Sequence, residues 1–170
     1  MYKQLVKVAC VIGLWLVTGS AMANWQTGAD ILAIKSDNHK RVNAFAGVVG
    51  YQFNVSEKFA IVPEFTLGAG IKKRREKGSE QTLKLSRYMA GSLNARYKVS
   101  PKMYIFGGPT VDKVRYRVKH KTNGKHREGK WRAGLKAGFG YQISSAIAAE
   151  LSYGQTKNDK LFRAGIRVKF

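Results

Sequence analysis

Hydrophobic and polar side chains alternate along most of the sequence, and this pattern restricts the possible folds more than any other feature. It is clearest in the last nine residues, where apolar Phe162, Ala164, Ile166, Val168 and Phe170 alternate with Arg163, Gly165, Arg167 and Lys169. Successive side chains of a β-strand point to opposite faces of the sheet. The segment therefore predicts a strand with one apolar face and one charged face.

The same alternation recurs in eight segments, and the sequence predicts an all-β protein. The predicted strands are 25–35, 41–54, 58–72, 82–98, 102–118, 130–143, 146–156 and 161–170. Three short connections with turn chemistry, 54–57, 99–102 and 143–146, join them as hairpin turns would. Four longer polar connections, 36–40, 72–82, 119–130 and 155–160, alternate with the short ones. This predicts antiparallel strands with tight turns at one end and loops at the other.

Residues 1–23 have the layout of a cleaved signal peptide. Lys3 and Lys7 precede an apolar stretch at 8–18, and Ala21-Met22-Ala23 provides small residues for cleavage. The apolar stretch is shorter than the roughly 20 residues that a spanning helix needs. A retained N-terminal anchor is the alternative. Removal of the leader, with Cys10, leaves one predicted domain, 24–170, which contains no cysteine and so no disulfide.

The chain is strongly basic, with 31 Lys and Arg against 10 Asp and Glu and a net charge of +21. Loss of the two leader lysines still leaves a net charge of about +19. Such an excess favours an anionic partner, which could be a phosphorylated lipid or an acidic polysaccharide. Export argues against nucleic acid as the partner, and we expect none.

Alternating strands fit either a soluble β-protein with an apolar core or a membrane barrel with an apolar outer face. The charged face of these strands is also rich in glycine and alanine, which suits the narrow interior of an eight-stranded barrel. We therefore predict an eight-stranded antiparallel up-and-down transmembrane β-barrel. Aromatic residues near the tight turns would form one interfacial girdle: Tyr51, Phe53, Phe59, Tyr97, Tyr104, Tyr141 and Phe170.

Three hairpins, GYQFNVSEKFAIVPEF (50–65), ARYKVSPKMYIFGG (95–108) and GFGYQISSAIAAELSYG (138–154), resemble the small outer-membrane barrels of the OmpA transmembrane-domain and OmpX-like (opacity-like porin) class. The resemblance implies a monomer in the Gram-negative outer membrane with both termini periplasmic. It also implies that the C-terminal strand carries the signal read by the barrel-assembly machinery, here Phe162, Ile166, Val168 and Phe170.

Four residues fit this barrel poorly. Pro63 and Pro109 fall inside predicted strands, where a missing N–H breaks the ladder, so we expect bulges there. Arg87 and Asp112 would face lipid in the simplest register, so each should lie at the outer rim or mark a register change. The register from Pro109 to Asp112 is left open.

The predicted inward face carries ionisable residues from most strands: Asp30, Glu64, Arg96, Arg132, Lys136, Glu150, Arg163 and Arg167. Charges inside a narrow barrel must pair or keep water. They would form an ionic plug that holds the barrel closed. The alternative is a gate whose changing ion pairs open a narrow ion-conducting pore.

Basic residues are concentrated at the predicted loop end: Lys72, Lys73, Arg74, Arg75, Arg115, Arg117, Lys119, Lys121, Lys125 and Arg127. Lysine and arginine bind phosphate well, and the outer leaflet presents phosphorylated lipopolysaccharide. The sequence thus predicts a structural or surface-interaction role, with extracellular loops that contact lipopolysaccharide or another polyanion.

Catalysis has one candidate constellation, His120-Lys121-Thr122-Asn123, which is similar to the His-x-Ser-Asn stretch of lipid A deacylases. Thr122 would have to replace the serine nucleophile, and Glu128 is the nearest acid. A base, a nucleophile and an orienting acid are all needed, so we predict no enzyme, with a lipid A-modifying barrel as the alternative. Three dispersed histidines predict no metal site, and no cofactor motif is present.

Overall fold

The structure is a computed structural model that describes residues 24–36, 39–71, 74–75, 82–119, 125–128, 131–157 and 159–170. The predicted signal peptide, residues 1–23, lies outside the described residues. No helix in the described part of the chain is long and apolar enough to cross a membrane.

Eight long strands form the wall of an all-β, antiparallel barrel, which confirms the predicted fold. They are β1 (Trp25–Ser36), β2 (His39–Tyr51), β4 (Phe59–Gly70), β6 (Thr82–Lys98), β7 (Met103–Lys119), β9 (Trp131–Gln142), β10 (Ile147–Thr156) and β11 (Asp159–Lys169). Three short strands extend the wall: β3 (Phe53–Asn54), β5 (Arg74–Arg75) and β8 (Lys125–Glu128).

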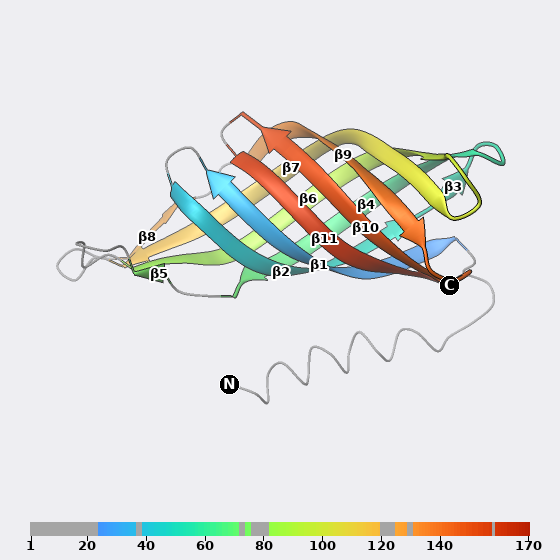
Figure 1. Ribbon diagram of the computed structural model, residues 1–170. Helices are drawn as coiled ribbons and strands as arrows, with labels where there is room; N and C mark the ends of the chain where they lie inside the picture. The colour runs from blue at the N-terminus through green and yellow to red at the C-terminus, as the bar shows by residue number, and fades with distance from the viewer. Residues whose placement is uncertain are drawn as a thin grey trace.

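The sheet closes on itself. Wall strands pair in the order β4-β2-β1-β11-β10-β9-β7-β6, and β6 pairs back to β4. Each wall strand therefore has a partner on both sides, and the strands incline to the barrel axis as closure requires (Figure 1). The first and last strands meet side by side, and the Phe170 N–H donates to the Trp25 carbonyl at 3.1 Å. Both ends of the barrel chain thus lie at the tight-turn end.

The three tight turns share one geometry. Val55, Val99 and Ile143 each donate a backbone N–H to the carbonyl four residues later, at 2.9–3.0 Å. The following serine, Ser56, Ser100 or Ser144, accepts the N–H of the residue three positions on at 3.0–3.1 Å. Serine satisfies a backbone donor that a hairpin turn would otherwise leave free. The turns therefore form at the three predicted positions.

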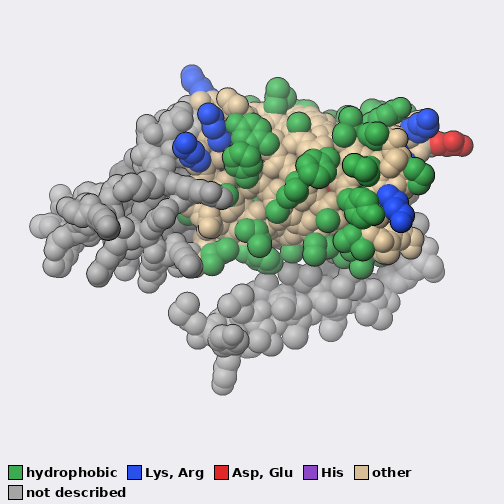
Figure 2. All heavy atoms as spheres, viewed as in Figure 1, with side chains coloured by type: hydrophobic (Ala, Val, Ile, Leu, Met, Phe, Trp, Pro, Cys, Tyr) green, Lys and Arg blue, Asp and Glu red, His purple; other side chains and the backbone are tan. Residues whose placement is uncertain are grey.

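Side chains alternate between the interior and the outside along every wall strand. In β9, Trp131, Leu135, Phe139 and Tyr141 are exposed while Lys136 is buried. In Figure 2 hydrophobic side chains cover the middle of the visible wall, and lysine and arginine side chains stand at its two ends. Apolar side chains on the outside and charged ones inside are the arrangement of a membrane barrel rather than of a soluble β-protein.

The prolines break the ladder without shifting it, so the expected bulges at Pro63 and Pro109 are wrong. β2 and β3 both pair with β4. The pairing is interrupted opposite Pro63 and continues beyond it in the same register. Pairing between β6 and β7 likewise skips Pro109 and resumes unchanged. The register shifts fall instead between Ile34 and Ser36 and between Leu85 and Arg87. Arg87 is exposed beside the second shift, as predicted for a residue that marks a register change.

Tyr104 and Asp112 face the interior, which corrects two predictions. Tyr104 is 4% exposed and Asp112 is 3% exposed, whereas Met103 and Ile105 point outward. The sequence reading placed Tyr104 in the outer girdle, and this choice also turned Asp112 toward lipid. Because β7 alternates without a break from Met103 to Arg115, every even-numbered side chain of that segment points inward. The register that was left open between Pro109 and Asp112 is therefore regular.

Candidate functional site

A cluster of six ionised side chains lies inside the barrel, in the half nearer the tight turns. Each comes from a different strand, and all are buried. The cluster, called here the ionic core, consists of Asp30, Glu64, Arg96, Lys136, Glu150 and Arg167. All six were predicted from the sequence as inward-facing residues.

Glu64 is the acceptor at one side of the ionic core. Its Oε2 accepts from Lys136 Nζ at 2.8 Å and from Asn94 Nδ2 at 2.8 Å, while its Oε1 accepts from Gln26 Nε2 at 3.0 Å. Arg167 Nε lies 3.8 Å from Glu64 Oε1. Glu64 is thus hydrogen-bonded on both oxygens, as a buried carboxylate must be to offset its desolvation.

Arg167 connects the two remaining carboxylates. Its guanidinium donates to both oxygens of Asp30, at 2.6 and 3.2 Å, and its Nε lies 3.1 Å from Glu150 Oε2. Glu150 Oε1 accepts from Arg96 Nη2 at 2.8 Å and from the Tyr104 hydroxyl at 2.7 Å. Planar guanidinium groups suit such two-point contacts with carboxylates.

Three acids face three bases in the ionic core, so its formal charge is zero. Breaking a buried pair typically costs about 3–5 kcal/mol because one charge is left uncompensated. The network therefore ties six strands of the wall together, and it offers no unpaired base or nucleophile. Nor does any group of three or more His, Cys, Asp or Glu among the described residues form a candidate metal site.

The other half of the interior, nearer the loops, is lined by an apolar layer. It consists of Leu32, Ile34, Val42, Ala44, Ala46, Tyr88, Ala90, Val114 and Leu161. Leu32, Ile34 and Tyr88 are at most 1% exposed. An aqueous path through the barrel would leave the atoms that line it accessible to water, so these side chains close the lumen.

The two other predicted interior cations lie beside this layer. Arg163 donates to the Tyr88 hydroxyl at 2.7 Å, and its guanidinium carbon lies 5.7 Å from the centre of the Tyr88 ring. Arg132 pairs with Asp159. All eight predicted interior residues are therefore inside the barrel or at its mouth, but Arg132 and Arg163 contact residues outside the ionic core.

The sequence reading missed several of the interior partners. Tyr104 was assigned to the wrong face, Tyr88 was not singled out, and the neutral hydrogen-bond partners Gln26 and Asn94 were not considered. Part of the apolar layer could have been predicted from the sequence. The run Ile31-Leu32-Ala33-Ile34 is apolar on both faces of β1, which indicates that its inward residues pack against apolar neighbours.

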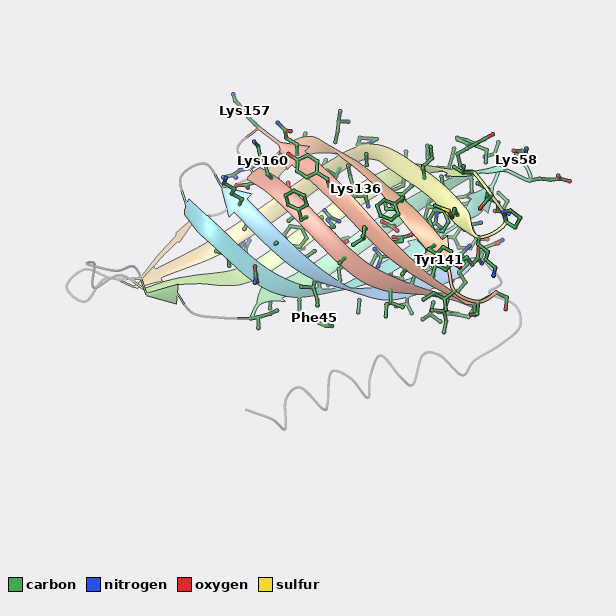
Figure 3. The ribbon with its side chains drawn as sticks, in the orientation of Figure 1. Phe45, Lys58, Lys136, Tyr141, Lys157 and Lys160 are labelled. Atoms are coloured by element: carbon green, nitrogen blue, oxygen red, sulfur yellow. The ribbon has the colours of Figure 1, made fainter. Side chains whose placement is uncertain are left out.

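Among the side chains that the structure describes, two pairs of directly opposed like charges lie on the outer face near the loop end. Lys35 is directly opposite Lys160 on β1 and β11, and Arg87 is directly opposite Arg115 on β6 and β7. All four side chains are exposed, and Figure 3 shows Lys160 at the loop end of the barrel. These four residues are called here the cationic rim. Only Arg115 among them was predicted as a polyanion-binding residue.

The structure describes part of the predicted loop cluster. Lys72, Lys73 and Lys121 lie outside the described residues, as do His120, Thr122 and Asn123 of the candidate catalytic constellation. Arg74 and Arg75 lie in β5, Arg117 and Lys119 in β7, and Lys125 and Arg127 in β8, at the loop end. Glu128 ends β8. The predicted basic residues thus converge on one end where the backbone is described.

No family model matches the chain, and no curated protein matches it. Among solved structures 56 chains match. Ail of Yersinia pestis, in complex with the heparin analogue sucrose octasulfate, has a TM-score of 0.62 at 13% identity over 86% of this chain and 97% of Ail. Neisserial surface protein A has a TM-score of 0.54 at 15% identity over 86% of this chain and 96% of its own.

The N-terminal β-barrel domain of OprF from Pseudomonas aeruginosa has a TM-score of 0.51 at 14% identity, and the similarity covers 85% of this chain and 97% of that domain. The chain has the fold of the small outer-membrane β-barrels. The predicted resemblance to the OmpA-like and OmpX-like class is therefore confirmed at the level of fold. This small barrel shares its closed eight-stranded wall with these proteins at identities of 13–15%.

Proposed function

We propose that the protein is an integral outer-membrane barrel whose cationic rim binds the phosphates of lipopolysaccharide. The observation that carries this proposal is the pairing of Lys35 with Lys160 and of Arg87 with Arg115. Like charges directly opposite each other in a sheet are destabilising. A phosphate group between the two side chains would turn each repulsion into two charge-assisted contacts.

The positions of the two pairs favour binding to the phosphate layer of a membrane leaflet over binding to a single small ligand. β1 and β11 lie on the opposite wall from β6 and β7, with two strands between them on either side. Glu57, at the tight-turn end, is the one exposed carboxylate among the side chains that the structure describes. A phosphate layer that surrounds the barrel would meet both pairs at once, whereas a single small ligand would meet one.

We infer the orientation from the two ends of the barrel. Outer-membrane barrels have short periplasmic turns and longer extracellular loops, so the serine turns and both termini would be periplasmic. The cationic rim would then lie at the level of the outer-leaflet headgroups. Residues 1–23 would direct export and be removed, and the barrel-assembly machinery would read Phe170 and the apolar side chains that precede it. The barrel would function as a monomer.

The complex of Ail with a heparin analogue supports considering sulfated polyanions as a second class of partner. Sulfate and phosphate groups present similar oxygens to lysine and arginine. For this chain we infer that the loop cations, Lys72 to Arg75 and Arg117 to Arg127, extend the cationic rim beyond the membrane surface.

The test replaces the rim with neutral side chains. The fourfold variant Lys35→Gln, Arg87→Gln, Arg115→Gln and Lys160→Gln, refolded in detergent micelles, should bind purified lipopolysaccharide at least about tenfold more weakly at low salt. The matched control exchanges charge for charge, Lys35→Arg, Arg87→Lys, Arg115→Lys and Lys160→Arg, and should keep most of the affinity. Wild-type affinity in the neutralised variant would contradict the proposal.

The absence of lipid A chemistry stays a prediction, because the candidate constellation at 120–123 lies outside the described residues. Mass spectrometry of lipid A from cells with and without the protein should give the same acyl composition. A lost or added acyl chain would show that the barrel is a lipid A-modifying enzyme, and the variant Thr122→Ala would then identify or exclude the predicted nucleophile.

A further inference from the structure

An apolar groove lies on the outer face of the barrel, where the first and last strands meet. Its volume is about 480 Å³, and outward side chains of β1, β11, β10 and β9 supply most of its lining. These four strands are neighbours in the wall (Figure 1). Ala33 and Ala164 contribute small side chains, and larger ones line the groove beside them: Phe139, Leu151 and Phe162. Ala33 points outward yet is only 9% exposed, so the wall is hollowed at this position.

Polarity falls along this groove from the loop end toward the middle of the wall. The opposed pair Lys35 and Lys160 of the cationic rim comes first. One outward position deeper, about 7 Å along a strand, the exposed Asn43 and Tyr153 stand in the cross-strand row that contains Ala33. The next outward row is apolar across β1, β11, β10 and β9: Ile31, Ala164, Leu151 and Phe139.

The Tyr153 hydroxyl is directed toward the lysine pair. It donates to Gln155 Oε1 at 3.3 Å, and Gln155 is directly opposite Lys160. The Tyr153 ring packs against Phe162, with 4.9 Å between the ring centres. This edge of the groove is therefore apolar where the ring lies and polar where the hydroxyl points to the loop end.

The other pair of the cationic rim stands over a different surface. One outward position below Arg87 and Arg115, the opposed residues are Met89 and Lys113. The Lys113 ammonium lies 5.2 Å from the centre of the Trp131 ring. A cation thus occupies the depth at which the β1–β11 face has alanine and phenylalanine, and the groove distinguishes the two lysines from the two arginines.

We propose that this groove holds one acyl chain of a lipopolysaccharide molecule whose phosphate lies between Lys35 and Lys160. The inference rests on the proposed function and adds one defined lipid position to the phosphate layer around the barrel. Lipid A carries phosphate, then amide and ester linkages, then acyl chains, which is the order of the surfaces along the groove. Asn43 and Tyr153 would hydrogen-bond to the linkages, where little water is present to satisfy them.

Packing, and not the hydrophobic effect, would select this chain. The acyl tails of the surrounding lipids are as apolar as the groove, so exchanging one for another gains little by transfer from water. A hollow that fits the chain gains dispersion contacts instead. The phosphate at the lysine pair would fix which lipid places its chain there.

The experiment compares intact lipopolysaccharide with its deacylated form, which keeps the phosphates but has no acyl chains. Ala164→Phe fills the middle of the groove in the refolded full barrel in detergent micelles. This variant should bind intact lipopolysaccharide about three- to tenfold more weakly than wild type, and it should bind the deacylated form equally well. Ala69→Phe is the matched control, because Ala69 is an exposed alanine of the same cross-strand row that does not line the groove. It should change either affinity less than about twofold.

A second measurement uses the wild-type barrel. With labelled alanine methyl groups and deuterated detergent, the Ala164 methyl should show nuclear Overhauser contacts to acyl methylene groups that saturate at one lipid per barrel. The Ala69 methyl should show no saturable contact. A saturable contact at neither methyl would overturn the proposal, whether or not the Ala164→Phe variant folds.

Three binding results would also overturn it. They are wild-type affinity of Ala164→Phe for intact lipopolysaccharide, an equal loss in Ala69→Phe, and equal competition by phosphatidylglycerol, which would show a site for any anionic lipid. The proposed function fails separately. Undiminished binding by the fourfold neutralised variant would contradict the cationic rim itself, whereas undiminished binding by Ala164→Phe beside a loss in the neutralised variant would remove only the acyl groove.

Discussion

Tyr97 and Tyr104 lie near the same end of the barrel, yet the alternation of their strands places them on opposite faces of the wall. Tyr104 donates to Glu150 at 2.7 Å, and its ring centre lies 4.4 Å from the guanidinium carbon of Arg96. Tyr97 is 46% exposed on the outer face. Only the inward hydroxyl is part of the network that joins the strands.

Removing each hydroxyl tests this difference. Tyr104→Phe should lower the free energy of unfolding by about 1–3 kcal/mol, because the buried Glu150 loses a hydrogen-bond donor. Tyr97→Phe should change it by less than about 0.5 kcal/mol. Urea unfolding of the two variants in lipid vesicles measures both values. Equal losses would show that the Tyr104 hydroxyl does not stabilise the ionic core.

At the level of the strand, the inward-facing glycines of β9 allow large side chains of the neighbouring strand β7 to pack closely against it. A Cβ atom at Gly140 would overlap the Tyr104 ring, whereas one at Gly47 on the outer face would meet nothing within 4 Å. Small residues on the inward face therefore leave room for the large side chains of β7. The sequence analysis related the glycines and alanines of the charged face to a narrow barrel interior, although it did not identify Tyr104 as the neighbour of Gly140.

Alanine substitutions separate these two positions. Gly140→Ala should destabilise the barrel by about 1–3 kcal/mol through overpacking against Tyr104, and Gly47→Ala should be neutral or stabilising by up to about 1 kcal/mol. Unfolding in the same vesicles checks both. If Gly140→Ala is as well tolerated as Gly47→Ala, the close contact between β9 and β7 is not a constraint on the fold.

The last strand supplies a test of assembly. Deleting Phe170 should reduce insertion in cells, because the aromatic C-terminus is the proposed signal for the assembly machinery, while the purified variant should still refold in detergent. Phe170→Tyr keeps an aromatic ring and should insert normally. The amount of heat-modifiable protein in the outer membrane measures the effect. Normal insertion of the deletion variant would remove the argument for a terminal signal.

Strand number, turn positions and the in-out alternation could all be predicted from the sequence, because each depends on local pattern. The wrong prediction for Tyr104 had a physical cause. Tyrosine suits both an interfacial girdle and a buried polar network, so the residue type alone does not determine which face of the strand the side chain occupies. The prolines were predicted to shift the register, but a missing N–H removes hydrogen bonds without inserting a residue. The apolar layer depends on which strands face each other, and alternation alone does not reveal that.

For the whole molecule, charge is divided between a balanced interior and a basic exterior. Among the charged side chains that the structure places inside the wall or at its loop-end mouth, the acids Asp30, Glu64, Asp112, Glu150 and Asp159 match the bases Arg96, Arg132, Lys136, Arg163 and Arg167 in number. Among the other charged side chains that the structure describes, Glu57 is the one acid, so the excess positive charge of this part of the chain lies at the ends and on the outer face of the barrel. A neutral interior suits a closed barrel, and a basic surface suits contact with anionic groups.

The apolar layer predicts that the barrel does not conduct ions. In planar bilayers the protein should give no stepwise conductance above the bilayer background, because Leu32, Ile34 and Tyr88 leave no water-accessible path. The variant Leu32→Gly and Tyr88→Gly removes the two largest of these side chains and should raise the conductance if it folds. Steady channels in the wild-type protein would instead support the gated-pore alternative.

The central claim is that the closed wall lies in the outer membrane with its apolar face in lipid. The most direct measurement is electrophoresis of the outer-membrane fraction with and without boiling. A closed transmembrane barrel resists detergent until it is heated, so the unboiled protein should migrate as a compact species and shift on boiling. Absence of the protein from that fraction, or identical migration before and after boiling, would contradict the account.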